Sequence, residues 1–455
     1  MGLILGSGST KPQFPYDMWY GVKGNTTSKD YKLTRVGNLD LHKTLPIQSR
    51  MKRFVENEDG SVKYYLGQND SRLKDGGAAS KLDSTDGNVM LEIPEHYFRL
   101  ELNGTEYIYA ISEYPLPGFT KVERMTIAPW FSTYDKVNNK AVSGSWIKWD
   151  GNTIARDADG IPQFVTGAEN YRGGNDQSSW DGTYRTVIGC GRTSVNKDAV
   201  RSWCKAAGNG IHHGAGRAYT TIMWLQRIEY ASKYCQDTYT ATLTSEGYHQ
   251  GGLGNGCTVD GNDWNTHNGY NPFVPGGITA PLGNNTGKVN YTVKNWAGKG
   301  TDKVIGVTSY RGFEVPFEYL WMLADDFLAY YGESASTLYI CRDPEKFTAP
   351  ADSATETPDG YTPEISLPRS GGYGWNEGIT PDGFSAVSSL GGSENTGNTD
   401  YFWNTATVGW WGALLGAYAN NGANAGFGYL NTNNRSSNAN ANIGFRFYRG
   451  FFFIA

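Results

Sequence analysis

Cysteine is scarce in this sequence and shows no paired spacing. The 455 residues include five cysteines, an odd number, and no two of them form a Cys-x-x-Cys motif. Disulfide-stapled scaffolds and structural zinc sites both need closely spaced cysteines, so neither is indicated, and folding in a reducing cytoplasm is favoured. The five are Cys190, Cys204, Cys235, Cys257 and Cys341.

Long apolar runs and long runs of one charge are also missing. No stretch approaches the roughly 20 apolar residues of a membrane-spanning helix. The formal net charge of -5 comes from well-mixed charges, so we expect neither nucleic acid nor an anionic membrane as a partner. Glycine motifs of the GxxxxGK or GxGxxG type do not occur, so nucleotide chemistry is not indicated.

The first residues lack the marks of export and of lipid attachment. Met-Gly-Leu-Ile-Leu-Gly-Ser has neither the basic region nor the long apolar core of a signal peptide. Gly6 stands where a myristoylation motif needs Ser or Thr. We therefore expect that the protein reaches an outside surface on a particle assembled in the cytoplasm.

Glycine and aromatic residues are abundant instead. The 59 glycines are roughly twice the usual share of about 7%. The 30 Tyr and 14 Trp are side chains that rigid binding surfaces use, although packing under long loops explains many of them equally well. The composition therefore predicts an ordered, loop-rich chain, in which one large decorated domain follows a smaller N-terminal part.

Local patterns divide the chain into segments. Residues 1–45 lack any period and are predicted to be an anchoring arm, and a β-rich segment follows over 46–140. Its clearest feature is a hairpin of strands 97–102 and 107–112 joined through Asn103-Gly104. Further β-strands are predicted near the C-terminus, over 407–417, 427–432 and 443–449.

Helical periodicity occurs in two longer segments. Apolar residues recur at three-and-four spacing over 217–236, and again over 316–331, where Pro316 suits the first position of a helix. A shorter helix over 197–207 is predicted to end at Gly208. The apolar stripes indicate core packing rather than cofactor binding.

The segment 420–442 is unusually rich in asparagine. It reads NNGANAGFGYLNTNNRSSNANAN, in which nine of 23 residues are Asn and one, Arg435, is charged. Unpaired buried amides would each cost about 1–3 kcal/mol, so we expect this segment to face solvent. A disordered low-complexity linker does not fit the hydrophobic strands that bracket it, and an Asn-ladder solenoid would need a repeat that is missing.

These motifs resemble those of one known family. The run WWGALLG at 410–416, the asparagine-rich segment and the closing Ile-Gly-Phe-Arg at 443–446 are similar to the variable region of diversity-generating-retroelement target proteins. The stretches 201–210 (RSWCKAAGNG) and 309–317 (SYRGFEVPF) resemble the signatures that precede the two helices of their C-type-lectin-like, formylglycine-generating-enzyme-like fold. The resemblance covers roughly residues 50–455 and is strongest at the C-terminus.

The resemblance implies a fold and a function. The fold would be α+β, a C-type-lectin-like domain over 141–455 with two helices flanking a small mixed sheet and long structured loops. The function would be that of a non-enzymatic phage tail receptor-binding protein of the major tropism determinant type, located in the virion, possessing no cofactor and forming a homotrimer. Its partners would be a host-cell surface receptor, protein or glycan, and other tail proteins through the arm. Alternatives are a bacterial surface-displayed binding protein and a formylglycine-generating-type enzyme.

The predicted ligand-binding residues lie in the diversified surface at about 405–446. Amides offer donors and an acceptor on a short side chain, and neighbouring tyrosines add apolar area. Because many asparagines remain, the resemblance implies a copy close to its undiversified template. The predicted set is Tyr418, Asn420, Asn421, Asn424, Tyr429, Asn431, Asn433, Asn434, Asn438, Asn440 and Asn442.

Other chemistry finds weaker support. Glycosidase carboxylates are not marked out among Asp260, Asp263 or the Glu314 and Glu318 pair, and Glu314 is predicted to form an ion pair with Arg311. The stretch 260–265 suggests a calcium loop, but Trp264 replaces a ligand. His212 and His213 are expected to be structural. No catalytic residue and no metal ligand is therefore assigned.

Overall fold

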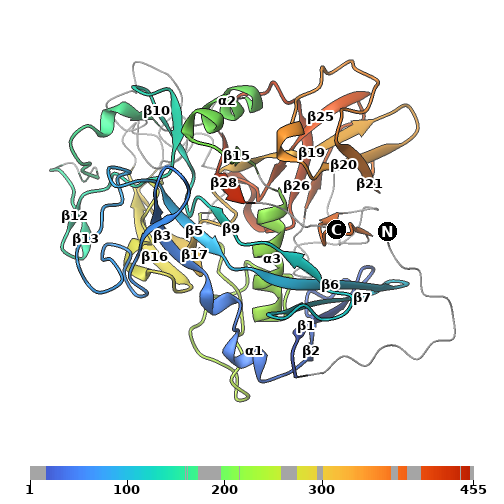
Figure 1. Ribbon diagram of the computed structural model, residues 1–455, viewed down its shortest axis with the longest axis horizontal. Coiled ribbons are helices and arrows are strands. Elements are labelled where there is room, and N and C mark those ends of the chain that lie inside the picture. Colours follow the sequence, from blue (N-terminus) through green and yellow to red (C-terminus); the bar gives the residue numbers. More distant parts are fainter. Residues whose placement is uncertain are drawn as a thin grey trace.

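The computed structural model is mainly β (Figure 1). It describes residues 17–158, 160, 162–172, 196–214, 216–257, 274–294, 301–369, 378–386, 401–440 and 442–450. Of the described residues, 38% are in strands and 13% in helices, so the predicted α+β domain of two helices flanking a small mixed sheet is wrong. The stretches 260–265 and Cys190 lie outside the described residues.

The N-terminal half contributes a five-stranded antiparallel sheet. Its strands, in spatial order, are β2 (Thr34–Gly37), β1 (Tyr20–Asn25), β7 (Glu106–Ser112), β6 (His96–Asn103) and β8 (Thr120–Val122). The predicted hairpin is confirmed as β6 and β7, with Asn103 opposite Glu106 and Gly104 at φ +62°. Because β1 pairs with β7 over six residues, residues 20–25 of the predicted arm are part of this sheet. The short helix α1 (Leu41–Thr44) follows β2.

A six-stranded sheet joins segments that are far apart in the sequence. Its order is β15 (Ile211–His213), β28 (Phe447–Gly450), β9 (Met125–Ile127), β5 (Val89–Ile93), β3 (Lys52–Glu56) and β4 (Val62–Tyr65). Strand β28, near the C-terminus, lies between β9 and β15. The C-terminal segment is therefore built into the core formed by the first half of the chain.

The C-terminal sheet carries seven strands. Their order is β21 (Tyr361–Ser366), β20 (Ser336–Cys341), β19 (Trp321–Tyr331), β25 (Gly409–Leu415), β26 (Leu430–Asn434) and β24 (Phe402–Trp403), with β27 (Ile443–Gly444) parallel to β19. The predicted β character of 407–417, 427–432 and 443–449 is thus confirmed in β25, β26, β27 and β28. One smaller sheet contains β16 (Gly287–Val293), β17 (Lys303–Tyr310) and β18 (Phe313–Glu314), and another contains β11 (Lys140–Val142), β10 (Thr133–Asp135) and β14 (Tyr171–Arg172). Two-stranded sheets pair β12 (Trp149–Asp150) with β13 (Thr153–Ile154), and β22 (Gly378–Ile379) with β23 (Ser385–Ala386).

The second predicted helix, over 316–331, is wrong, because this segment is the central strand β19. All but one of its eleven residues are buried, and β20 and β25 pair with it on either side within the sheet. A strand buried on both faces shows a nearly continuous apolar run, which periodicity cannot separate from a buried helix. A bulge between Ala324 and Leu328 also breaks the simple alternation.

The two other predicted helices are confirmed. Helix α2 (Lys197–Ala207) has the predicted bounds, with Gly208 as its C-cap, whereas α3 (Gly216–Tyr230) stops six residues before the predicted end. In Figure 1, α3 crosses the middle of the molecule, and it contacts both β1 and β19. Every residue of α3 is buried, so this helix links the N-terminal sheet to the C-terminal one.

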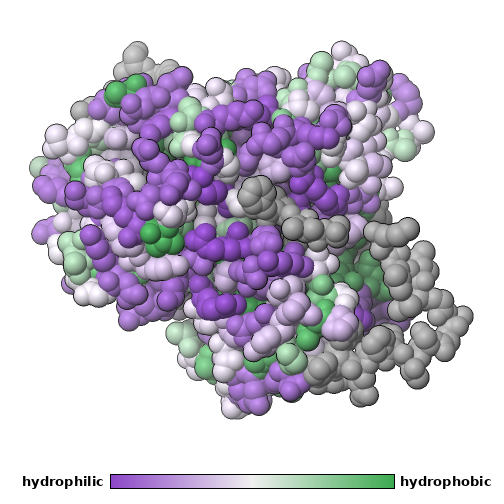
Figure 2. Space-filling view, viewed as in Figure 1, coloured by the Kyte–Doolittle hydropathy of each residue, from purple (hydrophilic) through white to green (hydrophobic). Residues whose placement is uncertain are grey.

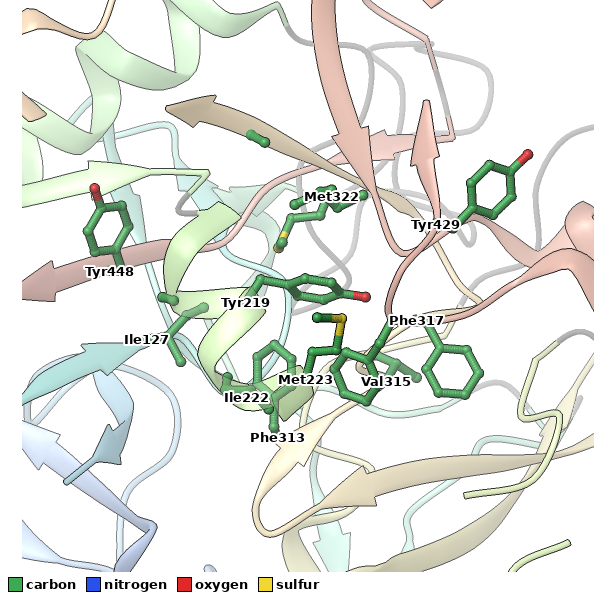
Figure 3. Packing of buried hydrophobic residues seen from close by; sticks show 14 of the residues in the cluster. Ile127, Tyr219, Ile222, Met223, Phe313, Val315, Phe317, Met322, Tyr429 and Tyr448 are labelled. Carbon is green, nitrogen blue, oxygen red and sulfur yellow. The ribbon is translucent and has the colours of Figure 1, made fainter. Parts of the chain in front are cut away.

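The main apolar cluster of the core spans these sheets and α3. In Figure 3, Met223 from α3 lies together with Val315 and Phe317, with the ring of Tyr219 beside them. The face drawn in Figure 2 is largely hydrophilic, with apolar residues in small scattered groups. Among the described helices, none has the length and hydropathy needed to cross a membrane.

Candidate functional site

The asparagine-rich segment leaves and rejoins one central strand. β25 ends at Leu415, which pairs with Met322 of β19, and the chain returns at Gly444 of β27, which pairs with the same Met322. Between these points it forms the 3-10 helix η7 (Ala419–Asn424) and strand β26. Since Met322 is only 3% exposed, both ends of the segment are anchored in the core.

The Ile-Gly-Phe-Arg end fits its surroundings tightly. Gly444 has no room for a side chain, because a Cβ there would lie 2.9 Å from a ring carbon of Phe131. Ile443 and Phe445 are buried. Packing therefore constrains each of these three positions.

Arg446 closes the motif as a buried clamp. Its guanidinium donates to the carbonyls of Glu314 at 2.6 Å, Val315 at 2.9 Å and Ala128 at 3.3 Å. It also lies 4.4 Å from the ring centroid of Phe313, a cation–π contact. Burial lowers the pKa of Arg446 to about 9. The end of the chain is thereby tied to two distant segments.

The predicted binding residues differ in exposure. Asn440 is exposed, and eight others are half-buried: Tyr418, Asn420, Asn421, Asn424, Asn433, Asn434, Asn438 and Asn442. Tyr429 and Asn431 are only 2% and 6% exposed, so the prediction of one wholly exposed patch is wrong for these two. In Figure 3, Tyr429 stands apart from the group around Tyr219 and Met223.

Part of the asparagine set is committed to a network of amide hydrogen bonds. Asn431 Oδ1 accepts from the backbone N–H of Asn433 at 2.9 Å and from Asn434 Nδ2 at 3.0 Å. Asn434 Oδ1 in turn accepts from Asn438 Nδ2 at 3.0 Å. These three amides satisfy one another, and they fix β26 and the turn that follows it.

A second committed amide stabilises η7. Asn421 Oδ1 accepts from the backbone N–H of Tyr418 at 3.0 Å, and its Nδ2 donates to the Tyr429 hydroxyl at 3.4 Å. From the segment after α3, Gln236 Nε2 donates to the carbonyls of Gly422 at 3.0 Å and Ala425 at 2.6 Å. The backbone of this loop is therefore held by side chains on both sides.

The remaining amides are not used by the fold. Within the described part of the chain, five side chains form no hydrogen bond, namely those of Asn420, Asn424, Asn433, Asn440 and Asn442. They are half-buried or exposed, so their donors and acceptors are open to a ligand. The hydrogen-bonded amides thus fix the backbone of this segment, which we call the frame, and the amides without hydrogen bonds lie on it and are accessible to a ligand.

Sequence reasoning missed an aromatic group beside this frame. Tyr401 and Trp403 stack at 6.0 Å between ring centroids, and Tyr401 meets Tyr429 edge-on at 5.0 Å. Tyr429 in turn meets Trp321 edge-on at 4.7 Å. Trp403 is 41% exposed. The run of three aromatic residues at 401–403 was the available signal for a short strand, because aromatic residues are enriched in strands.

The thiols show no catalytic arrangement among the described residues. Cys204, Cys235, Cys257 and Cys341 are buried, and Cys204, Cys257 and Cys341 form no disulfide. Burial raises the pKa of the Cys204 and Cys257 thiols far above the usual range, and that of Cys341 to about 11. A reactive cysteine needs a lowered pKa and access to solvent, so these environments are those of structural thiols.

The carboxylates considered for glycoside chemistry are used by the backbone. Glu314 accepts from the backbone N–H groups of Gly277 and Thr279, each at 2.7 Å. The predicted Arg311–Glu314 ion pair is wrong, since Arg311 binds Glu229 through Nε at 2.6 Å and Nη2 at 2.8 Å. Burial raises the pKa of Glu318 well above its usual range.

The two adjacent histidines have different surroundings. His213 Nε2 lies 3.0 Å from Asp325 Oδ2 in the core, and His212 is 3.9 Å from Glu345. No group of three or more His, Cys, Asp or Glu side chains suited to a metal ion occurs among the residues that the structure describes.

Comparison with known proteins found distant structural neighbours. No protein-family profile and no curated protein matches the chain. Among solved structures, the "Major Tropism Determinant U1 Variant" has a TM-score of 0.25 and 13% identity, covering 93% of this chain and 90% of that one. The "Major Tropism Determinant I1 Variant" has a TM-score of 0.22 and 12% identity, covering 91% and 88%. Likeness at this level does not assign a fold or a function.

Proposed function

We propose that this chain is a receptor-binding protein of a phage tail and that it recognises a ligand on the host-cell surface through the asparagine-rich segment. The observation that carries the proposal is that some amides of this segment form hydrogen bonds within the fold and others do not. One set holds the frame, and Asn420, Asn424, Asn433, Asn440 and Asn442 present amides that the described fold does not use.

Such a surface suits recognition for a physical reason. A ligand that binds a preformed surface loses less conformational entropy than one that must order a loop. Amides adapt to many partners because each offers two donors and an acceptor. Exchange of the uncommitted side chains therefore changes which ligand is bound without changing the frame, as the resemblance to retroelement-diversified proteins implies.

The setting of the protein belongs to the same proposal. We place it in the virion as a homotrimer, attached to other tail proteins through residues 1–45. Light scattering of the purified protein and proteomics of purified particles test these two points. Detection of the chain on intact bacterial cells in the absence of phage would favour the alternative, a surface-displayed binding protein of the bacterium.

The proposal excludes catalysis as the main role. The buried thiols of Cys204 and Cys257 and the backbone-bound Glu314 support this, because each lacks the exposure that a reacting group needs. A formylglycine-generating activity is tested by incubating the purified protein with a cysteine-containing substrate peptide and following the peptide mass. Conversion of the peptide contradicts the proposal.

The decisive experiment separates binding from stability. A variant with Asn420, Asn424, Asn433 and Asn440 all replaced by Ser should lose at least tenfold in adsorption to host cells. Its melting temperature should fall by only about 2 °C, because these side chains form no hydrogen bond with described residues and each surface substitution changes stability by about 0.5 kcal/mol or less. A matched control replaces the exposed Asn103 and Asn209 by Ser and should adsorb normally. Unchanged adsorption of the fourfold variant contradicts the assignment.

A further inference from the structure

The outer face of the edge strand β24 carries two rows of side chains. β24 and β26 run parallel with Trp403 opposite Asn431, and paired residues of adjacent strands point to the same face. Phe402, Leu430 and Thr432 are at most 1% exposed, so the other face is turned to the core. Tyr401 and Trp403 therefore lie outward.

The aromatic row is held rigidly. Trp403 stacks on Tyr401 with 15° between the ring planes, and Tyr401 is braced edge-on by Tyr429. Tyr429 is itself braced by Trp321 and accepts a hydrogen bond from Asn421. The Trp403 ring is the exposed end of this chain of contacts. It is presented to solvent in one orientation.

The amide row lies directly beside the aromatic row. Asn431 is fixed by Asn434, whereas the Asn433 side chain, two residues further along the same face, forms no hydrogen bond with described residues. The nearest charged residue in the segment, Arg435, is occupied: it donates to the Trp410 carbonyl at 2.6 Å and lies 3.7 Å from the ring centroid of Trp411. The two rows therefore combine apolar and neutral polar groups.

We propose that Trp403 and Asn433 form a subsite for one sugar ring of a neutral glycan. A pyranose has a face of C–H groups, which stacks on an aromatic ring, and an edge of hydroxyls, each able to donate and accept. Trp403 contacts the apolar face, and the Asn433 amide binds a pair of hydroxyls at the edge. Trp403 lies outside the set identified from the sequence. This inference rests on the proposed function and names the class of receptor.

The first experiment measures glycan binding directly. The probe is an array of neutral oligosaccharides of bacterial surface type together with uronic-acid-containing counterparts. The unchanged protein should bind neutral members, Trp403→Ala should bind them at least tenfold more weakly, and Trp403→Phe should stay within about threefold because it keeps an aromatic face. Asn433→Ala should also weaken binding. Tyr114→Ala is the matched control, because Tyr114 is 50% exposed and lies outside the C-terminal sheet.

The second experiment distinguishes the two proposals. Host cells are treated with periodate, which cleaves vicinal diols of sugars, or with a protease, and adsorption of the purified protein is then measured. Loss after periodate and retention after protease is the expected result. Loss only after protease overturns the glycan inference but leaves receptor binding intact. Adsorption that is unaffected in both the Trp403→Ala variant and the fourfold Asn variant overturns both.

Discussion

Asparagine performs two tasks within one short segment. Asn431 and Asn434 turn their amides to each other, whereas Asn433, between them, leaves its amide open. Strand alternation does not separate the two populations, because Asn431 and Asn433 lie on the same face of β26 and differ only in their hydrogen-bond partners. The sequence predicted the polar segment, but it could not distinguish the hydrogen-bonded amides from the open ones, because both are asparagine.

The first prediction compares these populations. Asn431→Ala removes the acceptor for the Asn433 N–H and for Asn434 Nδ2, so we expect it to lower the free energy of unfolding by about 1–3 kcal/mol. Asn433→Ala should change it by about 0.5 kcal/mol or less. Urea unfolding followed by fluorescence measures both. Equal losses in the two variants contradict the division.

The second prediction concerns pH and His96. Burial lowers the pKa of His96 to about 4, below its ordinary value of 6.5. The unfolded chain then binds more protons than the folded one between these pH values. The free energy of unfolding is therefore highest above pH 6.5 and decreases as the pH falls towards 4. The slope reaches about 1.4 kcal/mol per pH unit.

The test of this prediction uses a difference, so that other titrating groups cancel. His96→Gln keeps a donor for the Pro94 carbonyl, which lies 2.8 Å from His96 Nδ1. The free energy of unfolding of the unchanged protein should fall relative to that of the variant between pH 7.5 and 4.5. Parallel curves over this range exclude the role assigned to His96.

At the scale of elements, β19 shows how a strand can imitate a helix. Its residues are apolar nearly throughout, and the exceptions are Asp325 and Asp326 in the bulge. If the segment is read as a helix, these two residues fall on the polar face. Both carboxylates are inside the protein. Asp325 binds Arg201 at 2.6 Å, and Asp326 accepts from the backbone of Gly216 and Arg217 at the start of α3. The partners lie more than a hundred residues away, so sequence spacing carries no sign of them.

The third prediction tests this junction of strand and helix. Asp326→Ala leaves two N–H groups at the start of α3 without their acceptor and should cost about 2 kcal/mol of unfolding free energy. Asp326→Asn keeps one acceptor oxygen and should lose about half as much. Chemical denaturation gives both values. A loss for Asn as large as that for Ala would show that charge, rather than capping, matters at this position.

At the scale of the whole molecule, distant segments share one core. β28 lies between β9 and β15, so residues more than 200 positions apart form adjacent strands. Short-range signals predicted the hairpin β6–β7, the helices α2 and α3 and the C-terminal strands. They could not predict the sheet order, because pairing across such distances depends on tertiary contacts that no local pattern encodes. The place of Trp403 beside the amides was hidden for the same reason.

The fourth prediction concerns the clamp that joins these segments. Arg446→Met leaves the carbonyls of Glu314, Val315 and Ala128 without their donor, so we expect a loss of at least about 3 kcal/mol. Arg50→Met is the control, because Arg50 is half exposed and its ion pair with Glu113 contributes about 1 kcal/mol or less. Thermal unfolding compares them, and a similar loss in both variants contradicts the clamp.

The pairing of both ends of the asparagine-rich segment with Met322 bears on how its length can vary. Because Leu415 and Gly444 pair with this one residue from its two sides, the segment between them is a loop whose ends are separated only by strand β19. Doubling the length of such a loop costs only about 0.6 kcal/mol of closure entropy. The fold therefore tolerates changes in the size of this loop as well as in its side chains. Insertions and deletions at the exposed positions between β26 and β27, such as Asn440, would alter how far the surface reaches outward, a dimension of variation that codon replacement alone does not supply.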